Sequence, residues 1–316
     1  MFRRSANKVK PQILIDCDPG IDDAIALVTA AKYTEILGIT TVAGNVPLES
    51  TTRNTLALCE LLNLDVPVHA GAAHSLRGQV VTAEEVHGDQ GLGTLALPTP
   101  TKKIASDDAA TYIIESATHH KKLHLVALGP LTNIAEVIER EPNIVHQIAD
   151  LTIMGGSACG IGNVTAGAEF NIFADPEAAS VVFSSGVRLN MIGLNLTHQV
   201  QMGLSESKRL TRHNSIVSRA VAELLLSYQS LIHSGNLSKT VPMHDPCAIL
   251  AVSHPELFTL SARNVTVETA GIYTRGLTLV DERRAPAAAN CRVGYEANSR
   301  QLIKLILNAS MTSFQD

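Results

Sequence analysis

Four carboxylates lie within eight residues near the start of the chain, and carboxylates at this spacing are candidate metal ligands: Asp16-Cys17-Asp18-Pro19-Gly20-Ile21-Asp22-Asp23. Asp16 and Asp18 leave the same face of an extended segment, and the Pro-Gly turn brings Asp22 and Asp23 back beside them. Like charges this close repel one another, and a hard divalent cation such as Ca²⁺ or Mg²⁺ relieves that repulsion. A turn followed by an Asp N-cap is the alternative, but it needs only two of the four residues.

A His–Asp pair much later in the chain offers a second set of chemical groups, in the segment Met243-His244-Asp245-Pro246. His244 is a candidate general acid, and Asp245 is another candidate metal ligand. Alone this pair is a weak signal, because adjacent His and Asp residues are common on protein surfaces.

A third group combines amides with one carboxylate, as in sites that hold sugar hydroxyls. Asn163, Glu169 and Asn171 lie close together in the sequence, and Asn45 follows a different apolar segment. Taken singly, each Asn is also typical of a turn.

These residues need elements that position them, and the hydropathy pattern alternates between strand-like and helix-like segments. Strands are expected at Ile13–Asp18, Ile36–Val42, Leu123–Leu128, Asp150–Met154, Val187–Leu194, Val265–Glu268 and Thr278–Asp281. Helices are expected at Asp22–Ala31, Glu49–Leu62, Thr132–Arg140, Pro176–Ser185, Ile216–His233 and Ser299–Asn308. This alternation predicts an α/β fold with an open, mostly parallel, Rossmann-like central sheet and helices on both faces.

The unusual residues follow the predicted strands, where sheets of this kind bind their ligands. The segment Gly71–Thr101, rich in Gly, Pro and Thr, is a candidate mobile loop. No change of composition marks a domain boundary. We therefore expect a short N-terminal extension, residues 1–12, followed by a single domain over residues 13–316.

The composition favours a globular protein and excludes several classes of partner. Of the 316 residues, 45% are hydrophobic and 17% are charged, which allows a large core. A net charge of −5 and an aromatic content of 3% argue against binding to nucleic acid or to an anionic membrane. No apolar run is long enough for a membrane span or a signal peptide. Five scattered cysteines without a Cys-x-x-Cys motif indicate a reducing compartment, so a cytoplasmic location is expected.

Together the motifs resemble the inosine–uridine-preferring nucleoside hydrolase family. The matching segments occur in the family's order from about Ile13 to Asn308, and they are the acidic cluster, Thr41 to Asn45, Gly129-Pro130-Leu131-Thr132-Asn133, Met154-Gly155-Gly156, Asn163 to Asn171 and His244-Asp245-Pro246. The resemblance implies hydrolysis of the N-glycosidic bond of ribonucleosides to ribose and free base. It also implies a homodimer or a homotetramer.

The resemblance assigns roles to individual residues of the metal and sugar sites. It implies Ca²⁺ bound by Asp18, Asp23, Asp245 and the backbone carbonyl of Thr132, with Asp16 supporting them. It implies ribose hydroxyls held by Asp22, Asn45, Glu169 and Asn171, a 5′-hydroxyl held by Asn163, and a sugar pocket lined by Met154.

The chemistry of the bond explains these residue types. Cleavage builds positive charge on the sugar, which carboxylates favour. A metal ion lowers the pKa of the attacking water, and Asp18 is the candidate base that takes its proton. His244 is the candidate acid that protonates the leaving base. Direct attack by water, with inversion, is expected because no further carboxylate is free to act as the nucleophile.

The base pocket is less well defined by the sequence. Tyr228 is a candidate for stacking on the base, and His87 on the Gly71–Thr101 loop is a second candidate contact. Ile232 departs from the polar residues of some family members, and His233 is as well explained by an ordinary amphipathic helix. The loop Gly155–Gly162 is about one residue longer than is common in the family. The preferred nucleobase is therefore not predicted.

Two alternatives from other classes remain. Haloacid-dehalogenase-like phosphatases also begin with Asp-x-Asp after a first strand, but Gly20 stands where they carry Thr or Val. A nucleoside- or ribose-binding protein without catalysis would lack one of the matched residues, and none is missing. Turnover of a nucleoside separates both alternatives from a hydrolase.

Overall fold

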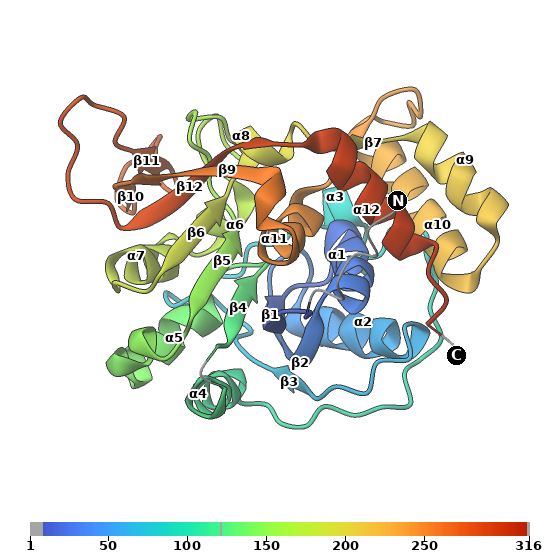
Figure 1. Ribbon diagram of the computed structural model, residues 1–316, viewed down its shortest axis with the longest axis horizontal. Helices are drawn as coiled ribbons and strands as arrows, with labels where there is room; N and C mark the ends of the chain where they lie inside the picture. The colour runs from blue at the N-terminus through green and yellow to red at the C-terminus, as the bar shows by residue number, and fades with distance from the viewer. Residues whose placement is uncertain (1–8, 121, 315–316) are drawn as a thin grey trace, which may run out of the picture.

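The computed structural model describes residues 9–120 and 122–314 (Figure 1). Residues 1–8 of the expected N-terminal extension lie outside this range, and the first strand begins at Gln12. In the described part of the chain, no helix is long and apolar enough to cross a membrane.

An eight-stranded sheet runs through the molecule in the order β3-β2-β1-β4-β5-β6-β12-β9. Its strands are β1 (Gln12–Cys17), β2 (Glu35–Thr41), β3 (Val68–Ala70), β4 (His124–Ala127), β5 (Asp150–Met154), β6 (Leu189–Ile192), β9 (Phe258–Arg263) and β12 (Cys291–Ala297). Neighbouring strands are parallel, except that the edge strand β9 runs antiparallel to β12. The predicted open, mostly parallel sheet is confirmed.

Helices cover both faces of this sheet (Figure 1). They are α1 (Ile21–Tyr33), α2 (Leu48–Leu61), α3 (Glu84–His87), α4 (Ala109–His119), α5 (Thr132–Arg140), α6 (Phe170–Ala174), α7 (Pro176–Ser184), α8 (Leu194–Thr197), α9 (Leu204–His213), α10 (Ile216–Ile232), α11 (His244–Ser253) and α12 (Ser299–Ser310). In β1, Ile13 and Ile15 pack into a core with α1 and α10–α12, whereas Leu14 packs into a second core with α4, α5 and α7. Alternate residues of a strand thus fill two separate cores.

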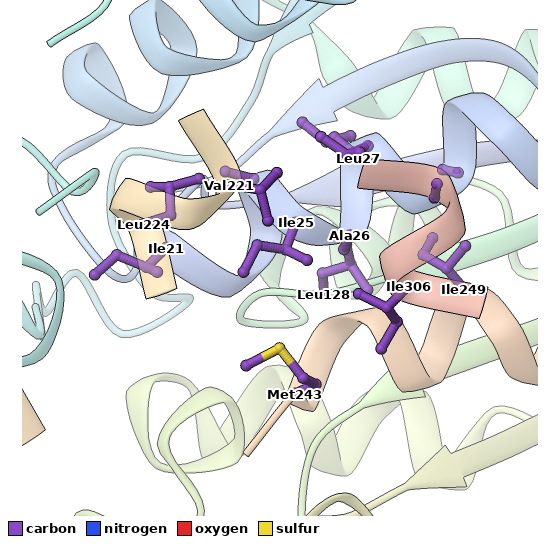
Figure 2. Packing of buried hydrophobic residues seen from close by; sticks show 14 of the residues in the cluster. Ile21, Ile25, Ala26, Leu27, Leu128, Val221, Leu224, Met243, Ile249 and Ile306 are labelled. Carbon is purple, nitrogen blue, oxygen red and sulfur yellow. The ribbon is translucent and has the colours of Figure 1, made fainter. Parts of the chain in front are cut away.

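Helix α1 lies inside the larger core, which fixes the start of the helix. Figure 2 shows Ile21 and Ile25 of α1 beside Val221 and Leu224 of α10. All four of these side chains are buried. Because α1 begins directly after the turn that ends β1, this packing also positions the acidic residues of its first turn.

The expected strands and helices are present within two residues at each end, but two strands lie elsewhere. β10 (Val265–Val267) and β11 (Thr278–Val280) form a separate antiparallel ribbon outside the central sheet. β9 and β12 complete the sheet, and the sequence does not predict them because exposed polar residues interrupt their apolar pattern. Helix α11 is also not predicted, because it is buried on almost every side and has no polar stripe.

The strand order creates a crevice at the carboxyl end of β1. The sheet continues from β1 to β2 on one side and to β4 on the other, so the following connections diverge. Asp16 lies on β1 and Asp18 directly after it, so both lie at this point. The predicted mobile loop Gly71–Thr101 contains only the short helix α3 and packs near this end of the sheet.

Candidate active site

The acidic segment forms the turn between β1 and α1, and Asp23 closes it. Its carboxylate accepts hydrogen bonds from the backbone N–H groups of Asp18 (3.2 Å) and Gly20 (3.0 Å). It also accepts one from the side-chain amide of Asn45 (2.9 Å), which follows β2. These bonds hold the ends of two neighbouring strands together.

Two carboxylates beneath this turn have unpartnered oxygens. Asp18 Oδ2 accepts a hydrogen bond from the Asn45 backbone N–H (2.7 Å). Asp16 Oδ1 accepts hydrogen bonds from Thr40 Oγ1 (2.6 Å) and Asn133 Nδ2 (2.7 Å). Asp18 Oδ1 and Asp16 Oδ2 are buried and have no hydrogen-bond partner among the described residues. Since buried carboxylate oxygens are normally satisfied, these two oxygens point to a missing ligand.

Two glycines allow the chain to pass close to Asp18. A Cβ atom on Gly44 would lie 2.1 Å from Asp18 Oδ2, and one on Gly129 would lie 2.5 Å from Asp18 Oδ1. Both distances are shorter than any van der Waals contact. Glycine at positions 44 and 129 is therefore required by the packing around Asp18.

The carboxylates suit a hard divalent cation. Asp22, Asp23 and Asp245 are buried and bring carboxylate oxygens within 4.8 Å of one another. Burial raises the pKa of Asp22 to about 8, and the charge of Asp23 adds to the rise. Burial also raises the pKa of Asp18 and of Asp245 well above the usual range. Hard oxygen donors and uncompensated buried acids fit a cation such as Ca²⁺ or Mg²⁺.

This geometric cluster differs in one member from the ligand set that the resemblance implies, because it contains Asp22 and not Asp18. Asp18 is nevertheless close enough for the charges of Asp23 and Asp22 to raise its pKa. Thr132 opens helix α5 and is buried, with its hydroxyl donating to Asp175 (2.8 Å).

A cavity of about 590 Å³ opens above the acidic floor. Ten of the residues singled out by sequence line its walls: Asp22, Asn45, His87, Met154, Asn163, Glu169, Asn171, Tyr228, His244 and Asp245. The other four, Asp16, Asp18, Asp23 and Thr132, are not among the lining residues and lie buried beneath the walls. The sequence-predicted residues thus come together at one site.

One wall of the cavity carries the carboxylate and amides suited to a sugar. Glu169 caps α6 and accepts hydrogen bonds from the backbone N–H groups of Asn171 (3.0 Å), Ile172 (3.2 Å) and Gly156 (2.9 Å). Burial raises the Glu169 pKa to about 7. The Asn171 side-chain amide donates to backbone carbonyls of Leu128 (2.6 Å) and Met154 (3.1 Å), which leaves its oxygen for a ligand.

Another part of the wall is aromatic and apolar. His87 and Tyr228 are buried and stack with their ring centroids 6.0 Å apart. The backbone N–H of Ile21 donates to His87 Nδ1 (3.0 Å), and burial lowers the His87 pKa to about 3, so its proton lies on Nε2 at neutral pH.

The apolar part of this wall is what sequence reasoning missed. Phe170, Leu231 and Val86 line the cavity together with Ile232, but in the sequence these three look like ordinary core residues. Only Ile232 stands out in the sequence, because some family members have a polar residue at this position. His233 is not among the lining residues, and its Nε2 lies 2.9 Å from the carbonyl oxygen of Thr240.

His244 is the first residue of α11 and lies beside the metal-ligand candidate Asp245. Its Nδ1 is 2.7 Å from the Thr197 hydroxyl. Burial lowers its pKa to about 3, and the neighbouring His198 adds to that effect.

Asn163 accepts a hydrogen bond from the Phe170 backbone N–H (2.9 Å), which fixes the loop before α6.

Comparison with known proteins identifies the class of this site. Residues 13–304 match the model of the inosine-uridine preferring nucleoside hydrolase family. The pyrimidine-specific ribonucleoside hydrolase RihA of Escherichia coli (strain SMS-3-5 / SECEC) is 43% identical over 276 residues, which cover 85% of this chain and 88% of that protein. The RihA of Shigella boydii serotype 4 is 44% identical over 279 residues, with the same coverage of both chains.

Solved structures lead to the same class. The purine-preferring ribonucleoside hydrolase of Gardnerella vaginalis has a TM-score of 0.89 and 30% identity, and the match covers 95% of this chain and 98% of that one. The plant nucleoside hydrolase PpNRh1 has a TM-score of 0.87 and 31% identity, over 96% of this chain and 99% of that one. The chain belongs to the inosine-uridine preferring nucleoside hydrolase family. It is a ribonucleoside hydrolase.

Proposed function

We propose that this enzyme hydrolyses the N-glycosidic bond of ribonucleosides with the help of a bound Ca²⁺ ion. The main support for the proposal is the set of buried, unneutralised carboxylates at the floor of a cavity of about 590 Å³. Asp18, Asp23, Asp245 and the Thr132 carbonyl would hold the cation, and Asp22 is a further ligand candidate. When bound, such an ion lowers the pKa of a water molecule and holds the diol of the ribose.

The chain's own residues would supply the base and the sugar contacts. Asp18 has a free oxygen, Oδ1, for the proton of the attacking water. Glu169 and Asp22 line the cavity as carboxylates that favour the positive charge developing on the ribose. Asn45 and Asn171 would hold ribose hydroxyls, Asn163 would hold the 5′-hydroxyl, and Met154 would pack against the ring.

The leaving base would be protonated by His244, in line with the inverting attack of water from the cation side. His244 is the second histidine of the cavity wall and lies next to a ligand candidate. His87 would donate from its Nε2–H to the base, while Tyr228 would stack on it. In this arrangement the two histidines would act on the base, and the carboxylates would act on the sugar and the cation.

We further propose that pyrimidine nucleosides are the preferred substrates. The support is the greater identity to relatives named pyrimidine-specific (43%) than to a structure named purine-preferring (30%).

The test of both proposals is ribose release from uridine, cytidine, inosine and adenosine, measured with Ca²⁺ and after chelation. Ribose that appears only with the cation, and fastest from uridine or cytidine, is the expected result. Ribose release that persists after complete chelation would refute the cation's role.

A cytoplasmic location and a homodimer or homotetramer are also proposed. All five cysteines are free, which supports a reducing compartment. Ile272 and Tyr273 in the β10–β11 loop are each more than 90% exposed and offer apolar surface for a contact between copies. Sedimentation velocity tests the assembly, and a monomer at micromolar concentration would contradict it.

A further inference from the structure

The hydroxyl of Thr197 contacts the candidate acid from behind the cavity. Thr197 Oγ1 lies 2.7 Å from His244 Nδ1, and Thr197 is fully buried. Among the described residues this hydroxyl has no other hydrogen-bond partner. A fully buried hydroxyl committed to a single imidazole nitrogen indicates a role for that contact, whereas the hydroxyls of Thr29, Thr34 and Thr55 only bond to helix carbonyls four residues earlier.

Several features of the fold hold this pair in register. Thr197 ends the short helix α8, whose Leu194 and Leu196 are fully buried in the core. The strands β7 (Gln201–Met202) and β8 (Val241–Pro242) pair with each other, and β7 begins four residues after Thr197 while β8 ends two residues before His244. A further bond runs from the Met243 N–H to the Val200 carbonyl (2.9 Å). The two chain segments therefore approach as a paired ribbon that sets the distance from Thr197 to His244.

We propose that Thr197 is a positioning residue for the proton donor of the reaction. Its hydroxyl occupies Nδ1 of His244 and fixes the plane of the ring, so Nε2 is the ring nitrogen left for the leaving base. The inference rests on the proposed function, specifically on His244 as the acid.

A hydroxyl is suited to this place because it can both donate and accept a hydrogen bond. The Thr197 hydroxyl donates to Nδ1 of the neutral ring, and it accepts from Nδ1–H when the ring is doubly protonated, so the 2.7 Å contact holds in both states. The Nε2–H bond of the doubly protonated ring breaks as a new bond to hydrogen forms on the base, which takes the electron pair of the cleaved glycosidic bond. The ring keeps its proton on Nδ1 and its bond to Thr197, so the orientation survives the transfer.

Thr197→Val tests the inference, because it removes the hydroxyl and keeps the side-chain shape. Two substrates separate positioning from general damage. Uridine needs protonation of its base, whereas 4-nitrophenyl β-D-ribofuranoside releases a stable anion without protonation. We expect kcat on uridine to fall about 100-fold, as for loss of an acid, and kcat on the nitrophenyl riboside to change by less than about 3-fold. Thr197→Ser should restore most of the uridine activity.

Two matched variants complete the design. Thr29→Val removes a fully buried hydroxyl that bonds only the Ile25 carbonyl, and it should leave both activities unchanged. His244→Ala should show the same selective loss as Thr197→Val. If Thr197→Val does not fold by thermal melting, Thr197→Ala takes its place.

Three outcomes would overturn the inference: equal losses on both substrates, full uridine activity without the hydroxyl, or a His244→Ala variant without selectivity. The proposed function fails separately, if the wild-type enzyme with Ca²⁺ releases no ribose from any ribonucleoside.

Discussion

At the scale of single residues, Asp18 combines burial, a tightly bonded oxygen and a free one. Asn45 N–H holds Oδ2, while Oδ1 has no partner in the described chain. Burial and the nearby charge of Asp23 raise its pKa. A carboxylate in this setting remains ionised only if a cation offsets its desolvation, which links its chemistry to metal binding.

Asp18→Asn tests this combination. The amide keeps the shape but can neither take a proton nor carry charge, so kcat on uridine should fall at least about 100-fold. Asp65→Asn, at an exposed carboxylate paired with Lys102, is the matched control and should be neutral. A steady-state assay at saturating Ca²⁺ makes the comparison. An Asp18→Asn rate within a few-fold of wild type would contradict the role of Asp18 as base.

Discrimination against deoxynucleosides is a second prediction at this scale. Asp22 and Asn45 line the cavity as candidate partners of ribose hydroxyls, and a missing 2′-hydroxyl would leave such partners unpaired. We expect kcat/KM for 2′-deoxyuridine at least about 1,000-fold below that for uridine. Competition kinetics measure the ratio directly. Similar values for the two substrates would remove the 2′-hydroxyl from the recognition scheme.

The sequence predicts the polar residues of the cavity better than its apolar ones, for a chemical reason. Asp22, Glu169 and Asn171 stand out because polar side chains beside apolar strands need an explanation. Phe170 and Leu231 do not stand out, because an apolar wall of a cavity and an apolar core are built from the same residue types.

At the scale of elements, the site depends on strand ends that approach one another closely. The loops after β2 and β4 pass Asp18 at distances that only glycine allows. The sequence predicts these elements because buried strands and amphipathic helices have clear periods. It does not predict α11, which carries His244 and Asp245, because a helix buried all round has no such period.

Gly129→Ala tests this close approach. The added Cβ would lie 2.5 Å from Asp18 Oδ1 and 2.8 Å from its Cγ, and Asp18 is fully buried and cannot swing away. We expect a loss of stability of about 2 kcal/mol and a fall in kcat of at least about 10-fold. Urea unfolding and a uridine assay measure the two effects. Unchanged stability and unchanged kcat would show that Asp18 tolerates the added Cβ.

At the scale of the whole molecule, buried acids link stability to pH and to the cation. Burial raises the folded-state pKa of Asp22 to about 8 and those of Asp16 and Glu169 to about 7, whereas the unfolded chain has ordinary values. The cation-free fold therefore binds more protons than the unfolded chain between these values. The stability that these protonated acids contribute is fully present below their pKa values in the unfolded chain. It is lost as the pH rises through their pKa values in the folded state.

Thermal melting across pH tests this link. In a chelating buffer, Tm should fall as pH rises from about 6.5 to about 8, which lies above the range where the buried His87 and His244 have the opposite effect. Ca²⁺ should raise Tm most at the upper end of this range. An exposed pair such as Asp281–Arg283 cannot produce this trend, because its pKa shift has the opposite sign. A Tm that rises between pH 6.5 and pH 8 without cation would contradict the role of the buried acids.

In the proposed function, a cation bound at the acidic floor of the cavity is required for ribonucleoside hydrolysis by this enzyme. The most direct measurement is a Ca²⁺ titration of the metal-free enzyme, with bound Ca²⁺ and ribose release from uridine followed in the same samples. The account predicts that activity rises in proportion to the occupancy of one site per chain, and that Asp245→Asn weakens both together. Full ribose release with the site empty, or Ca²⁺ binding that Asp245→Asn leaves unchanged, would contradict it.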